Sequence, residues 1–155
     1  MARRLIDLIQ THADELTDRL VQRIRSHRTT IGLRKYDDLE LGRRARDLYA
    51  HLDFWLRTSS DAEVEKSFRD FGRRERAEGI PASDLVGFIV LTRRNLWEYV
   101  ESEAGDSVLD LRQEVDLVIR VIRFFDRATY HAVRGWEEAP VAARRTAGSG
   151  AGATP

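Results

Sequence analysis

A heptad repeat near the C-terminal end constrains the fold of this chain more than any other feature of the sequence. Between residues 107 and 137, apolar or small side chains alternate in steps of three and four: Val108, Leu111, Val115, Val118, Ile122, Phe125, Thr129, Ala132 and Trp136. This spacing predicts one long helix with a continuous apolar seam. A second stripe runs beside the first: Leu117, Val121, Phe124, Ala128 and His131. A helix with two apolar stripes needs cover on two sides.

One side of this helix can be covered by the domain's own core, and we expect the other side to be covered by a second copy of the chain. The predicted homodimer seam consists of Val115, Val118, Ile122, Phe125 and Thr129. The alternative is a central helix that is surrounded entirely by helices of its own chain. Both interpretations remain open at the level of sequence.

The remainder of the chain also has helical periodicity, and no alternating strand pattern is found. Two amphipathic helices are predicted at about 3–27 and 38–57. A third begins at the S-x-x-E capping box of Ser60 and Glu63 and ends at the break "EGIP", and a fourth runs from Ser83 or Asp84 to about Glu103. Together with the heptad helix this gives an all-α domain of about five helices. The tail at 139–155, "APVAARRTAGSGAGATP", is rich in small residues and is predicted to be disordered. We therefore predict a helical domain at 1–138 and a flexible tail at 139–155.

Composition excludes several classes of function. The chain carries 26 basic and 26 acidic residues, and this balance argues against a general nucleic-acid or anionic-membrane binder. Cysteine is absent, so disulfide scaffolds and thiolate chemistry are excluded. No uninterrupted apolar segment approaches the length of a membrane span, and no signal peptide is evident. We expect a soluble cytoplasmic protein.

Catalytic and metal-binding motifs are not found in the sequence. None of the four histidines belongs to an H-E-x-x-H or E-x-x-H motif, and nucleophile elbows and phosphate-binding loops are missing. We therefore nominate no catalytic, metal-binding or cofactor-binding residue and expect no enzyme activity. His12 and His131 lie on apolar stripes, which is usual for buried core histidines; the alternative is that one of them is a haem ligand.

The stretch "FGRRERAEGIP", residues 71–81, contains a carboxylate in an unexpected place. Glu75 continues the apolar stripe of Val64, Phe68 and Phe71. One interpretation buries Glu75 against an arginine from another helix, with Arg43, Arg93 and Arg94 as candidates, because a buried carboxylate must be paired or neutralised. The other interpretation, which we favour at this stage, places Glu75 at the edge of the stripe, where it reaches water.

This stretch resembles the run around the proximal histidine of globin-coupled sensors. In that run an apolar residue and a glycine are followed by two variable residues, the histidine, three more residues and Gly-Leu-Pro or Gly-Ile-Pro. Here Glu75 stands at the histidine position, between Gly72 and the Gly79-Ile80-Pro81 corner. With "GIPASDL", a later "LTRRNLW" and a long final helix, the chain is most similar to the RsbRD-type N-terminal regulatory domains of stressosome proteins. The resemblance covers roughly residues 40–135.

The resemblance implies a haem-free, globin-like sensory domain that acts in stress signalling without catalysis. It places a vestigial ligand site at Gly72, Glu75, Gly79 and Pro81, and it implies either a shortened globin or a plain helical bundle. A free-standing copy would act through a protein partner, because output modules in that group are attached to the domain. The alternative function is that of an interaction or scaffold protein whose tail docks onto a larger assembly.

Overall fold

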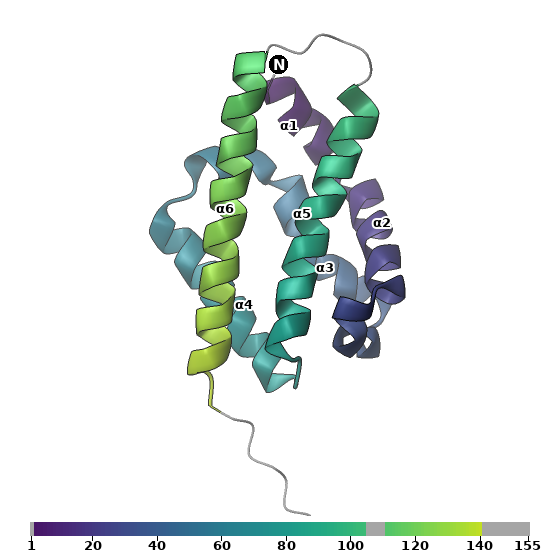
Figure 1. Cartoon of the computed structure of the whole chain (residues 1–155), viewed down its shortest axis with the longest axis vertical. Coiled ribbons are helices and arrows are strands. Elements are labelled where there is room, and N and C mark those ends of the chain that lie inside the picture. Colours follow the sequence, from purple (N-terminus) through teal and green to yellow (C-terminus); the bar gives the residue numbers. More distant parts are fainter. Residues whose placement is uncertain (1, 105–110, 141–155) are drawn as a thin grey trace, which may run out of the picture.

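The computed structural model describes residues 2–104 and 111–140, which form an all-helical domain in which no strand occurs (Figure 1). The elements in chain order are α1 (Ala2–Thr11), α2 (Ala13–Ser26), the 3₁₀ segment η1 (Arg28–Lys35), α3 (Asp38–Ala50), the π-type segment η2 (Phe54–Thr58), α4 (Asp61–Ala77), α5 (Ala82–Ala104) and α6 (Leu111–Glu138). The all-α prediction is confirmed. The predicted tail at 139–155 lies almost entirely outside the described residues.

The predicted count of about five helices is wrong, because two expected helices are each interrupted and one linker is itself helical. The first expected helix bends at His12, whose backbone leaves the helical region at φ −102° and ψ 23°. The linker "RTTIGLRK" forms η1, in which Thr30 buries its hydroxyl and donates it to the carbonyl of Ile24 at 2.9 Å. The second expected helix divides into α3 and η2 around His51.

The two long helices α5 and α6 run side by side in opposite directions along the longest axis of the molecule (Figure 1). The second predicted stripe of α6 faces the core of its own chain: Leu117, Val121, Phe124 and Ala128 are all buried. Phe124 sits in an aromatic cluster with Trp55 of η2 and Phe68 of α4, with ring centroids 5.7–5.9 Å apart. The inner side of the heptad helix is therefore covered by the domain itself.

Helices α4 and α6 pack with their backbones in direct contact. A Cβ added to Gly72 of α4 would overlap the carbonyl oxygen of Ala132, and a Cβ added to Gly135 of α6 would overlap the carbonyl oxygen of Arg69. Only glycine fits at these two positions. The contact is extended by the ion pair between Arg127 and Asp61, so α4 and α6 form one closely packed pair.

The corner between α4 and α5 ends one helix and starts the next. Gly79 has a positive φ of 78°, which glycine adopts without strain. The amides of Gly79 and Ile80 donate to the carbonyls of Arg76 and Glu75 at 2.9 Å each, the pattern of a Schellman motif. The carbonyl of Pro81, rather than Ser83 or Asp84, accepts the first bonds of α5. The helix therefore begins at Ala82, slightly before the expected Ser83 or Asp84, and the Asp84 carboxylate accepts the amide of Gly32 in η1 at 2.6 Å.

The capping box predicted at the start of α4 is confirmed. The amide of Glu63 donates to the Ser60 hydroxyl at 3.2 Å, and the amide of Ser60 donates to the Glu63 carboxylate at 2.6 Å. Over the ranges that the structure describes, every helix is too short or too polar to cross a bilayer.

Candidate functional site

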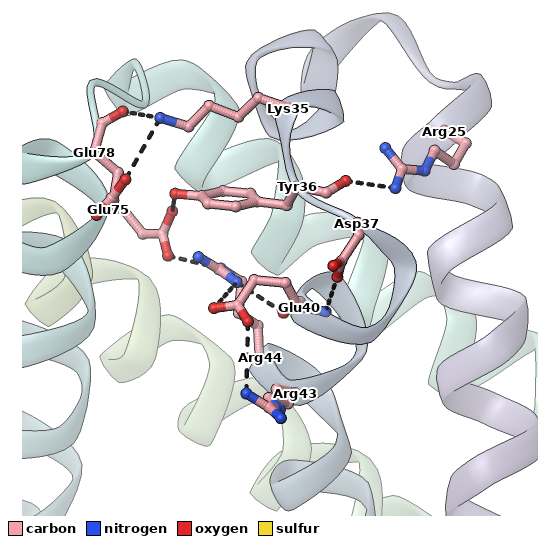
Figure 2. Close-up of polar contacts among 9 residues, drawn as sticks. All are labelled: Arg25, Lys35, Tyr36, Asp37, Glu40, Arg43, Arg44, Glu75 and Glu78. Atoms are coloured by element: carbon pink, nitrogen blue, oxygen red, sulfur yellow. Dashed lines mark hydrogen bonds and ion pairs between the residues drawn. The ribbon is translucent and has the colours of Figure 1, made fainter.

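Glu75 is buried, and it is held by two side chains that come from another part of the chain (Figure 2). Only 3% of its surface is exposed. Arg44 of α3 donates its Nε hydrogen to Glu75 Oε1 at 2.8 Å, and the Tyr36 hydroxyl donates to Oε2 at 3.3 Å. The favoured edge interpretation of Glu75 is therefore wrong. The buried-pair interpretation is correct, although the partner is Arg44 and not Arg43, Arg93 or Arg94.

Arg44 is itself clamped on several sides. Its guanidinium lies over the ring of Tyr36, 3.9 Å from the centroid, and Nη1 donates to the carbonyl of Glu40 at 2.7 Å. The Glu40 carboxylate is 3.5 Å away. Because its donors are engaged by two acids and a carbonyl, the burial of the Arg44 charge is compensated.

Local sequence explains how these groups meet. Asp37 caps α3 by accepting the amide of Glu40 at 2.8 Å, and from this start Glu40 and Arg44 follow one helical turn apart on the same face. Tyr36 is fixed just before the cap, where its carbonyl accepts a hydrogen bond from Arg25 of α2 at 2.5 Å. The end of η1 and the start of α3 therefore present Tyr36 and Arg44 to α4.

The electrostatics of the cluster keep the Tyr36 hydroxyl protonated. Partial burial and the nearby Glu75 carboxylate raise the pKa of Tyr36 to about 12, and Arg44 opposes this rise. At neutral pH the phenol is therefore a hydrogen-bond donor to Glu75. Lys35 closes the cluster from outside by donating to the Glu78 carbonyl and lying 3.7 Å from the Glu78 carboxylate.

A cavity of about 760 Å³ lies beside Glu75, between α3, η2, α4, α5 and α6. One part of its wall is apolar and is formed by Leu48, Trp55, Phe68, Phe71, Phe88, Ile89, Phe125 and Ala128. The polar part is formed by Tyr36, Glu40, Arg43, Arg44, Asp47, Ser67, Arg74, Glu75, Glu78 and Thr92. The exposed side chains of Arg43, Arg74 and Glu78 mark where this cavity reaches the surface.

The four residues of the predicted vestigial ligand site have separate places in the structure. Glu75 lies in the cavity wall, whereas Gly72 faces α6 and is explained by the α4–α6 contact. Gly79 and Pro81 form the corner before α5 and do not line the cavity. Of this set, Glu75 alone stands at the cavity, so the idea that the four form one former ligand site stays a prediction.

The five residues of the predicted dimer seam divide between the surface and the core. Val115, Val118 and Ile122 are exposed, and Ile119 joins them on the same face. Phe125, by contrast, is 2% exposed and lines the cavity, and Thr129 is half-buried with its hydroxyl bonded to the Phe125 carbonyl at 2.7 Å. An outward apolar surface therefore exists on α6, and it covers the N-terminal half of the predicted seam.

Neither histidine considered as a haem ligand lies at the cavity. His12 is partly exposed at the bend between α1 and α2, 3.5 Å from Glu15. His131 is half-buried on α6, where its ring packs edge-on against Tyr130. Among the residues that the structure describes, no group of three potential metal-ligating side chains is found. The cavity therefore offers aromatic surface and a paired carboxylate, and its residues provide no ligand set for a metal.

Sequence reasoning missed Tyr36 and Arg44. The available signal was the position of Arg44 one turn after Glu40 in a helix that opens with an Asp37 cap. That signal predicts a local ion pair, and it does not predict the contact with Glu75, 31 residues further along the chain.

The comparisons with known proteins complete the description of the site. Residues 14–148 match the family described as RsbT co-antagonist protein rsbRD N-terminal domain. This range includes Tyr36, Arg44 and Glu75 and all described residues of α6. No curated protein and no solved structure matches the chain.

Proposed function

Because the chain belongs to the family of RsbT co-antagonist protein RsbRD N-terminal domains, a family of regulatory domains in stress signalling, we propose that it acts through contacts with other proteins, beginning with a second copy of itself. The haem-free, globin-like character that the sequence resemblance implies is part of this proposal. It is supported by a cavity that is bordered by Glu75 in place of a histidine.

The observation that carries the proposal is the outward apolar surface of α6. Val115, Val118, Ile119 and Ile122 each keep between 37% and 51% of their surface exposed, although Val115, Val118 and Ile122 continue the regular spacing of the heptad. A surface helix of a monomer normally turns polar residues outward, and contiguous exposed apolar side chains mark interaction sites. We assign this surface to a homodimer contact.

A second copy is the occupant that fits the charges around this surface. Among the described side chains of α6, two acids and two bases that are exposed flank it, namely Asp116, Asp126, Arg120 and Arg123, and the whole chain has a formal net charge of zero. Two copies therefore meet without net repulsion, and a two-fold axis through α6 would place the same apolar side chains against one another. In such a dimer, a change in α6 would be presented to a signalling partner by both copies.

Replacement of Ile122 by aspartate tests the proposal. We expect the wild-type chain to have the mass of a dimer in native mass spectrometry and Ile122→Asp to have the mass of a monomer, because a buried unpaired carboxylate would disrupt the contact. Ile122 is exposed in the single chain, so the variant should remain folded. Phe125→Asp is unsuitable, because Phe125 belongs to the core and its replacement would unfold the domain.

Lys66→Asp is the matched control, since Lys66 is exposed on α4, away from the apolar surface. The control should remain a dimer. A monomeric wild type, or an Ile122→Asp variant that remains dimeric, would remove the α6 contact from the proposal.

A further inference from the structure

The cavity beside Glu75 has the size and the wall of a small-molecule site. Its volume of about 760 Å³ falls in the range of roughly 300–1,000 Å³ in which ligand pockets are found. Six aromatic side chains contribute to its wall: Tyr36, Trp55, Phe68, Phe71, Phe88 and Phe125. Such a wall favours a ligand whose body is apolar and flat, because aromatic faces and edges pack well against it.

The charged groups at the cavity neutralise one another. Glu75 is bound to Arg44 at 2.8 Å, Glu40 lies 3.7 Å from Arg43, and Glu78 lies 3.7 Å from Lys35. Two further wall residues carry opposite charges, Arg74 and Asp47. The wall residues comprise four acids and three arginines, and Lys35, which pairs with Glu78 from outside the wall, balances the fourth acid, so the cavity has little net charge with which to select an ion.

The hydrogen-bonding groups of the wall differ in how far they are already engaged. The Tyr36 oxygen donates its hydrogen to Glu75 and keeps lone pairs with which it can accept a bond from a ligand. The Thr92 hydroxyl donates to the Phe88 carbonyl at 2.8 Å and can likewise accept a bond. A ligand with a polar group near Tyr36 and Glu75 would therefore find an acceptor in the Tyr36 oxygen.

We propose that this cavity binds an uncharged, largely aromatic small molecule with one hydrogen-bonding group, which lies near Tyr36 and Glu75. The regulatory meaning of such binding rests on the proposed function, whereas the binding itself does not. At the end near Tyr36 the charges of Glu75 and Arg44 are already paired, so an anionic or cationic ligand there would have to disrupt that pair and lose its own hydration.

The cavity adjoins the outward surface of α6. Phe125 and Ala128 line the cavity, and Ile122 precedes Phe125 by about one helical turn. A ligand that packs against Phe125 therefore contacts the same helix that carries the apolar surface. A ligand that changes the position of α6 would also change the outward surface, and linkage would then require that association of two copies alters the affinity for the ligand by the same factor.

The test uses N-phenyl-1-naphthylamine, an uncharged aromatic amine whose fluorescence rises in apolar surroundings. We expect saturable binding to the wild-type chain with one site per chain. Ser67→Trp should weaken this binding by about tenfold or more, because Ser67 is exposed and lines the cavity, so that a large side chain there occupies the opening. Lys66→Trp is the matched control, because Lys66 is the exposed neighbour that does not line the cavity.

The charge of the ligand is tested with 8-anilino-1-naphthalenesulfonate, which has the same ring system and a negative charge. The uncharged probe should bind at least as tightly as the sulfonate. Tighter binding of the sulfonate would overturn the assignment of an uncharged ligand. Absence of saturable binding to the wild type, or equal loss in Ser67→Trp and Lys66→Trp, would overturn the site itself.

The two proposals fail separately in this design. Ile122→Asp should keep its affinity for the uncharged probe within about twofold of that of the wild-type monomer, since Ile122 does not line the cavity. If the probe does not bind while Ile122→Asp still separates a dimer, the ligand site is refuted and the dimer stands. If the probe binds to a chain that is always monomeric, the dimer is refuted and the ligand site stands.

Discussion

The two sides of α4 are built in opposite ways. On the side of α6, Gly72 and Gly135 allow the two backbones to touch, and no space is left for a single methyl group. On the side of α3 and α5, α4 faces a cavity of about 760 Å³, and the ion pair between Glu75 and Arg44 forms part of its wall. The comparison shows that α4 is held by close packing on one side and by a few directed polar contacts on the other.

Close packing and polar bridges respond differently to change. Packed backbones are insensitive to pH and ligand but intolerant of added atoms. A buried ion pair is intolerant of losing one partner, and the space around it can be filled without moving the backbone. The cavity side is therefore the side on which α4 can be influenced from outside.

The largest expected effect is on the cavity side. Glu75→Ala should lower the free energy of unfolding by about 3–5 kcal/mol, because it leaves the guanidinium of Arg44 buried without its main partner. The measurement is urea unfolding monitored by circular dichroism. Glu78→Ala is the control, since the Glu78 side chain is exposed and its pair with Lys35 should contribute about 0–1 kcal/mol. Equal effects of the two variants would show that the ion pair does not hold α4.

A smaller loss is expected on the packed side. Gly72→Ala should destabilise the protein by about 2–3 kcal/mol, because the new methyl group forces α4 and α6 apart. The comparison variant is Gly42→Ala in α3, where the added Cβ would lie 3.2 Å from Thr17 Cγ2.

Both glycine variants gain the same helix propensity, about 1 kcal/mol, so their difference reports the cost of the α4–α6 contact. Thermal unfolding of the two proteins provides that difference. A Gly72→Ala variant that is as stable as Gly42→Ala would contradict the close contact of the backbones.

The smallest expected effect concerns pH. Tyr36→Phe should cost about 1.5 kcal/mol at neutral pH, because it removes one hydrogen bond to a charged group. The folded protein holds the phenolic proton more tightly than the unfolded chain does, since the pKa of Tyr36 is raised from 10.0 to about 12. Stability from this group is therefore complete below pH 10 and is lost as the pH rises toward 12.

The buried Tyr49, whose pKa is also raised, contributes to the same alkaline loss. Tyr36→Phe should consequently show a shallower fall in stability between pH 10 and 12 than the wild type, without abolishing it. Tyr130→Phe is the control, because Tyr130 is exposed, and its pH dependence should match that of the wild type. An unchanged slope in Tyr36→Phe would show that the phenol is not coupled to Glu75.

The sequence predicts those parts of the fold that depend on local periodicity. The heptad of α6, its inward stripe at Leu117 and Phe124, and the capping box at Ser60 depend on residues three or four positions apart. The bend at His12 was missed because apolar residues continue in phase across it, so that the pattern of one helix persists while the backbone departs from it.

The site depends on contacts between distant segments, and there local patterns are insufficient. The stripe of α4 correctly singled out Glu75 as unusual, but both its burial and the identity of its partner are decided by the approach of α3. Arg43 and Arg44 are adjacent in the sequence, and periodicity alone does not show which of them turns toward α4. Gly72 shows the opposite kind of error: it matches a ligand motif in the sequence, but the need for glycine at this position comes from its contact with Ala132.

Because their backbones touch, α4 and α6 would move together as one rigid unit. Val115 on the outward surface precedes Ala132, where Gly72 touches α6, by 17 positions, or about 26 Å of helix at a rise of about 1.5 Å per residue. If α6 tilted by about 5° around the glycine contact, Val115 would move by about 2 Å, and a partner bound there would be displaced with it. A small tilt is enlarged along α6 in this way only if the helix pair does not bend, and the backbone-to-backbone contact gives the pair that rigidity.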